Sequence, residues 1–178
     1  MTLHADAVDV LTRWRAPDDA QDALRRTYLR HLGHHRDAMQ RSCRPDHLTA
    51  SVLVMSADRS QVLLTLHRKL GRWLQTGGHC EDVDADLVAA ATREGVEESG
   101  IDGLRTDPDP VLLSRHEVPC GPVRPAHHLD VQFVAYAPPG ARERISDESA
   151  ALTWFPIGAL PDSADASVRA LVEHAARR

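Results

Sequence analysis

Residues 77–101 read GGHCEDVDADLVAAATREGVEESGI, and this stretch decides how the rest of the chain is interpreted. A glycine pair is followed by a run of acidic residues and then by a segment with helix-like composition. The expected helix begins at about 84–86 and runs to Ser99, and Gly100 is well placed to end it in the left-handed conformation. The segment therefore predicts a glycine-containing backbone that other groups can approach closely, followed by a charged helix.

Three carboxylates of this helix are expected on one face. Because successive helical residues advance by about 100°, Glu94, Glu97 and Glu98 fall within an arc of about 100°, and Arg93 lies just beyond Glu97. The clustering is repulsive at neutral pH, and Arg93 offsets it only in part. Hard cations such as Mg²⁺ take oxygen ligands and bridge to substrate phosphates, so the face suits a cation site. The alternative is a solvated helix face.

The glycine pair favours a site over a solvated face. Glycine permits close backbone approach, and amides exposed in a glycine turn can point at phosphate oxygens. We therefore expect Gly77, Gly78 and the following His79 to contact a substrate. For His79, an ordinary surface histidine is the alternative.

With these residues in view, the sequence resembles the Nudix hydrolase family (MutT-like), whose box is written G-x5-E-x7-R-E-U-x-E-E-x-G-U, with U a bulky apolar residue. The matching positions are Gly78, Arg93, Glu94, Glu97, Glu98, Gly100 and Ile101. The segments HLTASVLVM, VLLTLHRKLGRWLQTGGH and ALTWFPIGAL extend the resemblance over about residues 47–176. It implies an α+β fold, a Nudix-type α/β/α sandwich with a mixed β-sheet, over residues 47–178. Residues 1–46 lie outside the resemblance and are expected to form an additional N-terminal helical segment.

The resemblance also implies a reaction. This is metal-dependent cleavage of the diphosphate linkage in a nucleoside diphosphate joined to another moiety, with Mg²⁺ or Mn²⁺ as cofactor and a small molecule as partner. Glu94, Glu97 and Glu98 would be the metal ligands, one of them also serving as base, and Arg93 would orient them. Glu148, outside the box, is the candidate for a further catalytic acid, with a solvated loop glutamate as the alternative.

The box departs from the family pattern in its first half and at Gly95. The first glutamate of the pattern is either replaced by Asp84, with one extra residue before Arg93, or falls on Ala85; Asp84 and Asp86 are the candidate substitutes. A glycine in mid-helix costs about 1 kcal/mol relative to alanine, so a loosely held helix is expected. These departures motivate the alternative of a non-catalytic, regulatory Nudix domain that binds a nucleotide derivative. The complete set of three glutamates argues against it.

Composition limits the other function classes. A chain of 178 residues with 42% hydrophobic residues is enough for one ordinary core. A net charge of −5 and a pI of about 6.1 lack the basic excess of proteins that bind nucleic acid polymers. The N-terminus is not that of a signal peptide, and no apolar run approaches the roughly 18 residues of a membrane span, so we expect a cytoplasmic protein without membrane contact. Three widely spaced cysteines fit neither a disulfide framework nor a CxxC metal site.

Hydrophobic patterning predicts the remaining elements. Two helices are expected in the first 45 residues, and they are candidates to cap the core or to pair two chains in a homodimer. Strands are expected at about 49–55, 62–66, 72–75, 110–117, 129–136 and 152–155, with a final helix from about 163 that presents Val168, Leu171, Val172 and Ala175 on one face. The first two strands, separated by a four-residue turn, are expected to form a hairpin.

Several further residues invite a functional interpretation. His127 and His128 do not predict a zinc site, because neighbouring residues on a strand point to opposite faces. Asp130 or one of the histidines is instead a candidate to line a substrate cleft. Trp73 is expected in the core rather than stacked on a base. Cys80 is not expected to be a nucleophile, because no neighbouring base is identifiable.

Overall fold

A computed structural model of the chain describes residues 1–119, 122–146 and 149–178. In chain order its elements are α1 (Leu3–Arg13), α2 (Asp19–His34), β1 (His47–Met55), β2 (Gln61–His67), β3 (Trp73–Leu74), β4 (Thr76–His79), α3 (Leu87–Ser99), β5 (Arg105–Thr106), β6 (Leu112–Glu117), β7 (His127–Tyr136), β8 (Ser149–Pro156) and α4 (Ala166–Ala175). The helices and most strands match the expected ranges, whereas β4 and β5 are additional. No helix in the described part of the chain is both long and apolar enough to cross a membrane.

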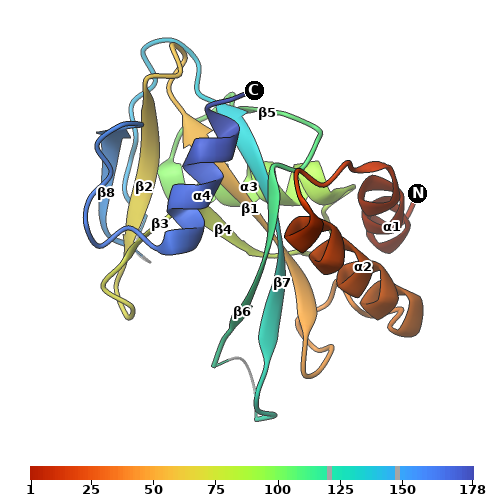
Figure 1. Ribbon diagram of the computed structural model, residues 1–178. Coiled ribbons are helices and arrows are strands. Elements are labelled where there is room, and N and C mark those ends of the chain that lie inside the picture. Colours follow the sequence, from red (N-terminus) through yellow and green to blue (C-terminus); the bar gives the residue numbers. More distant parts are fainter. Residues whose placement is uncertain (120–121, 147–148) are drawn as a thin grey trace.

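Within the described residues, eight strands form one mixed sheet with β1 at its centre (Figure 1). β1 runs parallel to β7 from His47 opposite His128 to Met55 opposite Tyr136. The other edge of β1 is divided, because residues 49–52 pair with β4 and only the last two residues pair with β2. The hairpin expected between the first two strands is therefore present but short. This division places β4 beside β1, directly before the helix of the box.

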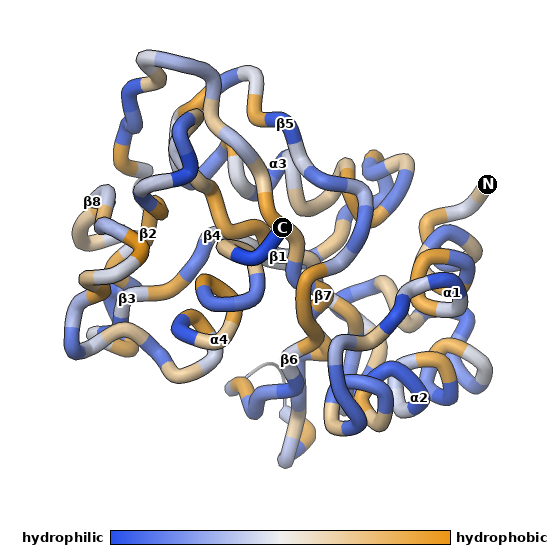
Figure 2. The backbone as a smooth tube through the Cα atoms, turned by 45° about the horizontal axis from the view of Figure 1, so that its top comes forward, coloured by the Kyte–Doolittle hydropathy of each residue, from blue (hydrophilic) through white to orange (hydrophobic). Residues whose placement is uncertain are grey.

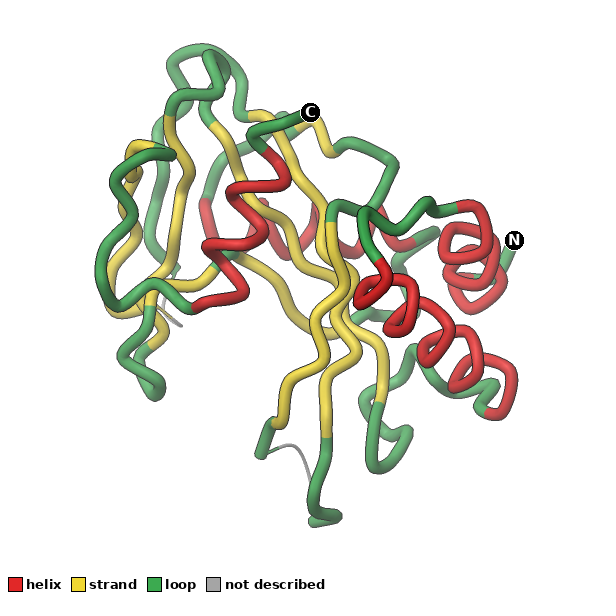
Figure 3. Tube along the Cα trace, in the orientation of Figure 1, coloured by secondary structure: helices red, strands yellow, loops and turns green. Residues whose placement is uncertain are grey.

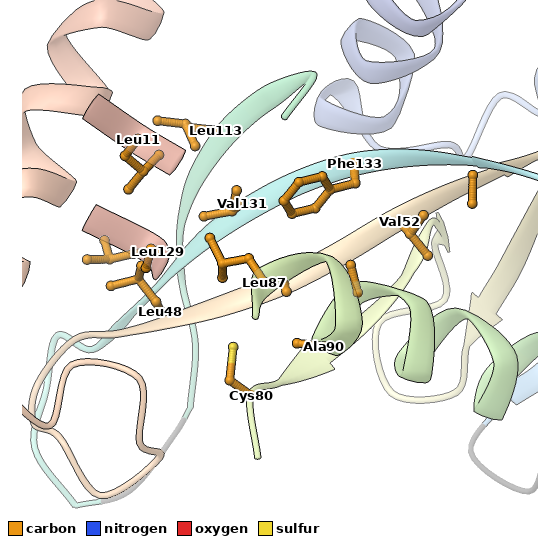
Figure 4. Packing of buried hydrophobic residues seen from close by; sticks show 14 of the residues in the cluster. Leu11, Leu48, Val52, Cys80, Leu87, Ala90, Leu113, Leu129, Val131 and Phe133 are labelled. Atoms are coloured by element: carbon orange, nitrogen blue, oxygen red, sulfur yellow. The ribbon is translucent and has the colours of Figure 1, made fainter. Parts of the chain in front are cut away.

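Helices cover both faces of the sheet, as the secondary-structure view in Figure 3 shows. Leu48, Ala50 and Val52 of β1 belong to the core cluster under α1, α2 and α3, whereas Leu53 and Met55 belong to the cluster under α4. Figure 4 shows side chains of α3 facing those of β1 and β7. Hydrophobic residues concentrate along β7 at the centre of the molecule, and hydrophilic ones on α2 (Figure 2). The expected α/β/α sandwich with a mixed sheet is confirmed.

The N-terminal helices cap the core of the domain. Leu11, Tyr28 and Leu32 are buried in the same cluster as α3. The amide group of Gln21 donates to the carbonyl of Leu113 at 3.1 Å and accepts from its N–H at 2.7 Å, so α2 serves as a partner for the edge of β6. The carboxylate of Asp6 in α1 accepts the N–H of Leu87, the first residue of α3, at 2.9 Å. The N-terminal segment thus supports the helix of the box.

Replacing Gln21 tests this docking. In Gln21→Ala the N–H and carbonyl of Leu113 both lose a partner, and an unsatisfied buried polar group costs about 1–3 kcal/mol. Because the contact is part-buried, we expect the free energy of unfolding to fall by about 1–2 kcal/mol in urea titrations. Gln40, which is exposed, supplies the control variant Gln40→Ala. Equal stability of the two variants would show that α2 is not docked on β6 in solution.

Gly95 corrects the expectation of a loosely held helix. A Cβ atom built at this position would lie 2.6 Å from Cγ1 of Val52 and 3.1 Å from Cδ1 of Leu104. Val52 is fully buried in β1, and its β-branched side chain is stiff, so such a contact is costly to relieve. The missing side chain therefore lets α3 pack closely onto β1, which the family pattern alone does not indicate.

Two glycine substitutions should consequently change stability in opposite directions. Gly95→Ala is expected to lower the free energy of unfolding by about 1–3 kcal/mol through overpacking, although alanine is the better helix former. A Cβ atom added at Gly33 in α2 would meet no neighbouring group within 4 Å, so Gly33→Ala should stabilise the protein by about 0.5 kcal/mol. Thermal and urea unfolding measure the change in stability of both variants. A Gly95→Ala variant that is more stable than the parent chain would contradict the close packing of α3 on β1.

Candidate active site

Helix α3 begins and ends at residues suited to these positions. Its N-cap is Asp86, whose side chain accepts the N–H of Ala89 at 2.7 Å. Its C-terminus is closed by Gly100 with φ +64°, as expected, and the N–H of Gly100 donates to Val96. Because the apolar side of the helix is buried on β1, its charged face is held in one orientation next to β4.

Arg93 is the centre of the polar contacts on this face. Its Nε and Nη2 atoms each donate to the carboxylate of Asp84 at 3.0 Å. Nη2 also donates to the carbonyl of His79 at 2.9 Å, and Nη1 donates to Glu94 at 3.0 Å and Glu97 at 3.1 Å. The hydrogen bond to Asp84 is the main reason that the pKa of Arg93 is raised, so the guanidinium stays charged. Arg93 joins the loop before α3, strand β4 and two box glutamates.

The two aspartates in the irregular first half of the box, Asp84 and Asp86, make different contacts. The side chain of Asp84 is 3% exposed, and besides Arg93 it accepts the N–H of Glu81 at 2.8 Å. Asp86, two residues later, caps the helix. The additional residue before Arg93 is therefore compatible with a bidentate ion pair between Arg93 and an acidic residue of the loop.

The glycine pair lies in strand β4 rather than in an open turn. Gly77, with φ +154°, lies opposite Ser51 of β1, and a Cβ atom there would lie 2.3 Å from Cβ of Ser51. The N–H of Gly77 donates to Oε1 of Glu98 at 3.0 Å. A Cβ atom on Gly78 would lie 2.7 Å from Oε1 of Glu94. Gly78 thus allows the carboxylate of Glu94 to approach β4, whereas Gly77 allows β4 to lie close to β1.

The three box glutamates differ in exposure. Glu94 is 15% exposed in its side chain and lies against Gly78, whereas Glu97 is 58% exposed and projects toward solvent. Glu98 is half-buried next to Gly77. Glu94 and Glu97 accept from the same Nη1 atom of Arg93. The arrangement offers carboxylate oxygens with one orienting cation, a donor set that suits a hard divalent ion.

Some of the predicted residues lie elsewhere. Glu148 lies outside the described residues. The backbone of His79 contacts Arg93, but its ring lies on the other face of β4, 5.1 Å from the ring of His47 and 4.9 Å from that of His128. Trp73 packs edge-on against Phe155 at 4.8 Å, in agreement with a packing role.

Cys80 shows no sign of nucleophilic activation. The residue is buried, and burial is the largest factor that raises the pKa of its thiol to about 12. A thiol with this pKa is almost entirely protonated at neutral pH, whereas the thiolate is the reactive form. This environment agrees with the sequence-based view that Cys80 is not a nucleophile.

Sequence-based reasoning named Asp130 as a candidate to line a substrate cleft, but it missed the buried row of polar side chains around this residue. The carboxylate of Asp130 accepts from Thr49 at 2.9 Å, from Ser51 at 2.6 Å and from Gln132 at 3.3 Å, and all four residues are buried. They lie on the face of β1 and β7 that points away from α3. The signal that could have found them is the two-residue alternation of polar and apolar side chains in HLTAS and HLDVQ.

Comparison with known proteins identifies the family and supports the fold. The sequence profile of the NUDIX domain matches residues 45–175. No curated protein sequence matches the chain. Among solved structures, a NUDIX-family hydrolase from Clostridium perfringens has a TM-score of 0.60 and 22% identity, and the match covers 74% of this chain and 96% of that one.

Two further structures are similar at the level of the fold. An Ap4A hydrolase from C. elegans, solved as a binary complex, has a TM-score of 0.62 and 18% identity, covering 73% of this chain and 95% of its own. The dihydroneopterin triphosphate pyrophosphohydrolase of E. coli has a TM-score of 0.59 and 19% identity, covering 71% and 92%. Because the profile match spans residues 45–175, which is most of the chain, the chain belongs to the NUDIX domain family.

Proposed function

We propose that the chain hydrolyses the diphosphate linkage of a nucleoside diphosphate joined to another moiety, with Mg²⁺ or Mn²⁺ as cofactor. The observation that carries this proposal is the contact set of Arg93, which brings the loop before α3, strand β4 and the glutamates of α3 together. A merely solvated helix face would not need a guanidinium with five hydrogen bonds to hold it.

The donor set fits a divalent cation. Glu94, Glu97 and Glu98 would hold the ion through carboxylate oxygens, which Mg²⁺ and Mn²⁺ prefer. Once bound, such an ion offsets the negative charge that develops on a diphosphate during attack by water. The fit is supported by Gly78, because a side chain at that position would collide with the carboxylate of Glu94.

The protein residues have separate roles in this proposal. Arg93 orients Glu94 and Glu97 and does not contact the substrate. One carboxylate of the set, or Glu148, accepts the proton of the attacking water, and a positioned base of this kind contributes about 10²–10⁴-fold to a rate. We place the phosphates along β4 at Gly77, Gly78 and His79, where the backbone is closest to the carboxylates. Gly77 acts through its hydrogen bond to Glu98.

A substrate panel tests the proposal. Purified protein is incubated with nucleoside triphosphates, nucleotide sugars, dinucleotides and dinucleoside polyphosphates, with Mg²⁺, with Mn²⁺ or with a chelator, and a coupled phosphatase reports diphosphate cleavage. We expect turnover of at least one class that stops in chelator. Absence of turnover throughout, together with a melting shift caused by one of the same ligands, would instead indicate a regulatory domain that binds a nucleotide derivative.

A further inference from the structure

Three histidines from three different strands meet on the face of the sheet that points away from α3. His47 begins β1, His128 lies opposite it on β7, and His79 ends β4 opposite Thr49 of β1. Their ring centroids are 4.9–5.1 Å apart. One potential ligand atom from each of the three lies within 4.8 Å of the others. Strand register alone brings them together, since they are at least 32 residues apart in sequence.

The Nε2 atoms of these rings are buried without a hydrogen-bond partner among the described residues. This holds for His47, His79 and His128 alike. Buried polar atoms are nearly always paired, so three unpartnered nitrogens on adjoining rings call for a ligand. Nδ1 of His47 lies 3.3 Å from the carbonyl of Cys43, which can only accept, so Nδ1 carries the hydrogen and Nε2 keeps its lone pair. A second hydrogen bond of this type is what orients metal-binding histidines in proteins.

The local electrostatics keep the imidazoles neutral. Burial, and after it the neighbouring His47, lowers the pKa of His79 to about 4, and burial together with His79 lowers that of His128 to about 3. Arg41 and Arg44 contribute in the same direction to His79. A neutral imidazole is the form that binds a metal ion.

We propose that His47, His79 and His128 bind one divalent transition-metal ion of the zinc type through their ring nitrogens, at a site separate from the carboxylates of α3. Zn²⁺ binds histidine nitrogen at about 2.0–2.1 Å, which separates the nitrogens of a tetrahedral site by roughly 3.4 Å. The ligand atoms now lie within 4.8 Å of one another, so the rings would have to draw their nitrogens closer on binding. Three ligands leave a fourth position for water or an anion, and the ions Mg²⁺ and Mn²⁺, which favour oxygen, are poor occupants.

The site has a structural link to the box. The carbonyl of His79 accepts from Arg93, and Gly77, two residues earlier, donates to Glu98. An ion at the histidines would therefore tie the end of β4 to β1 and β7, directly behind the backbone that contacts the carboxylates. Binding there is independent of whether the chain cleaves diphosphates.

A second group of potential ligands must be distinguished from the first. His35, Asp37 and Cys43 also place one ligand atom each within 4.8 Å of the others. Asp37 of this group is exposed, and Sγ of Cys43 already lies 3.9 Å from Nε2 of His31, whereas the other group offers three buried ring nitrogens without a partner among the described residues. We therefore assign the ion to the three histidines.

Metal content measured on untagged full-length protein tests the proposal. The protein is loaded with Zn²⁺ in the presence of excess Mg²⁺, dialysed, and analysed by atomic absorption; we expect one zinc per chain. His79→Asn and His128→Asn should each weaken zinc binding by at least about 100-fold in competition with a chromogenic chelator. His127→Asn, on the same strand but facing Asp46, and Cys43→Ser are the matched controls and should retain zinc, as should Glu98→Gln.

Measurements on the parent chain keep the test valid if a histidine variant fails to fold. Co²⁺-loaded protein should show the intense d–d bands of a tetrahedral site and no thiolate-to-cobalt charge-transfer band. Zinc retained in both His79→Asn and His128→Asn, zinc lost in Cys43→Ser, a thiolate band with Co²⁺, or a parent chain that binds no zinc would each overturn the assignment. None of these readouts depends on turnover, so they are separate from the test of the hydrolase.

Discussion

A Glu98→Gln variant is expected to lose turnover by a factor of about 10²–10⁴ while it unfolds like the parent chain. Oε1 of Glu98 accepts the N–H of Gly77, and the amide oxygen of glutamine can accept the same hydrogen bond, so the contact between α3 and β4 remains. What disappears is the negative charge that a cation requires. Removing the like-charge pair that Glu98 forms with Glu94 one turn away should even stabilise the helix, by about 0.2–0.5 kcal/mol.

Phosphate release from the best substrate of the panel measures this loss, and circular dichroism follows the melting. Glu81→Gln is the matched control, because Glu81 is 59% exposed and its carboxylate lies 3.9 Å from Arg93. Exposed pairs of this kind contribute little, so the control should keep its rate within about twofold. A parental rate in Glu98→Gln would remove this glutamate from the catalytic set.

Arg93→Ala is expected to lower the free energy of unfolding by about 3 kcal/mol and turnover as well. The substitution leaves the carboxylate of Asp84, which is 3% exposed, without its bidentate partner. Removing one member of a buried pair costs about 3–5 kcal/mol, and the lower end applies because the Arg93 side chain is itself 18% exposed. Turnover falls because Glu94 and Glu97 lose the donor that orients both of them.

A double-mutant cycle separates the pair from the rest of the contact set. Arg93→Ala leaves the charge of Asp84 buried and unpaired, and Asp84→Ala removes that charge. The double variant should therefore lose less free energy of unfolding than the sum of the two single losses. Strictly additive losses would contradict a direct pair. Arg115→Ala serves as control, because Arg115 is 42% exposed and lies 3.6 Å from Asp46, a contact worth at most about 1 kcal/mol. Urea unfolding measures all four variants.

The box helix was predictable to within a few residues because its signals are local. A capping aspartate, a helical stretch and a terminal glycine lie next to one another in the chain, and each acts on its own backbone. The fold class followed from the box and from the alternation of strand-like and helix-like segments. The roles of Asp84 and Asp86 could not be separated in this way, because the loop between β4 and α3 decides which of them reaches Arg93.

The structural roles of three glycines could not be predicted from the sequence. Gly77 and Gly78 were expected in an open turn but form β4, since the pairing partner that makes them a strand is β1, some 27 residues earlier. Gly95 was expected to loosen the helix, whereas it allows close packing on Val52. In both cases the effect of a missing side chain depends on a neighbour that is distant in sequence.

The sequence by itself determined the composition of the helix face, because the positions of Glu94, Glu97 and Glu98 around α3 follow from the helical repeat alone. It also determined the family, through the spacing of the box. Only the tertiary structure decided that Arg93 pairs with Asp84, and that His47, His79 and His128 meet on one face of the sheet. The physical reason is that helix periodicity is set within a single turn, whereas strand register is set by pairing between segments far apart in the chain.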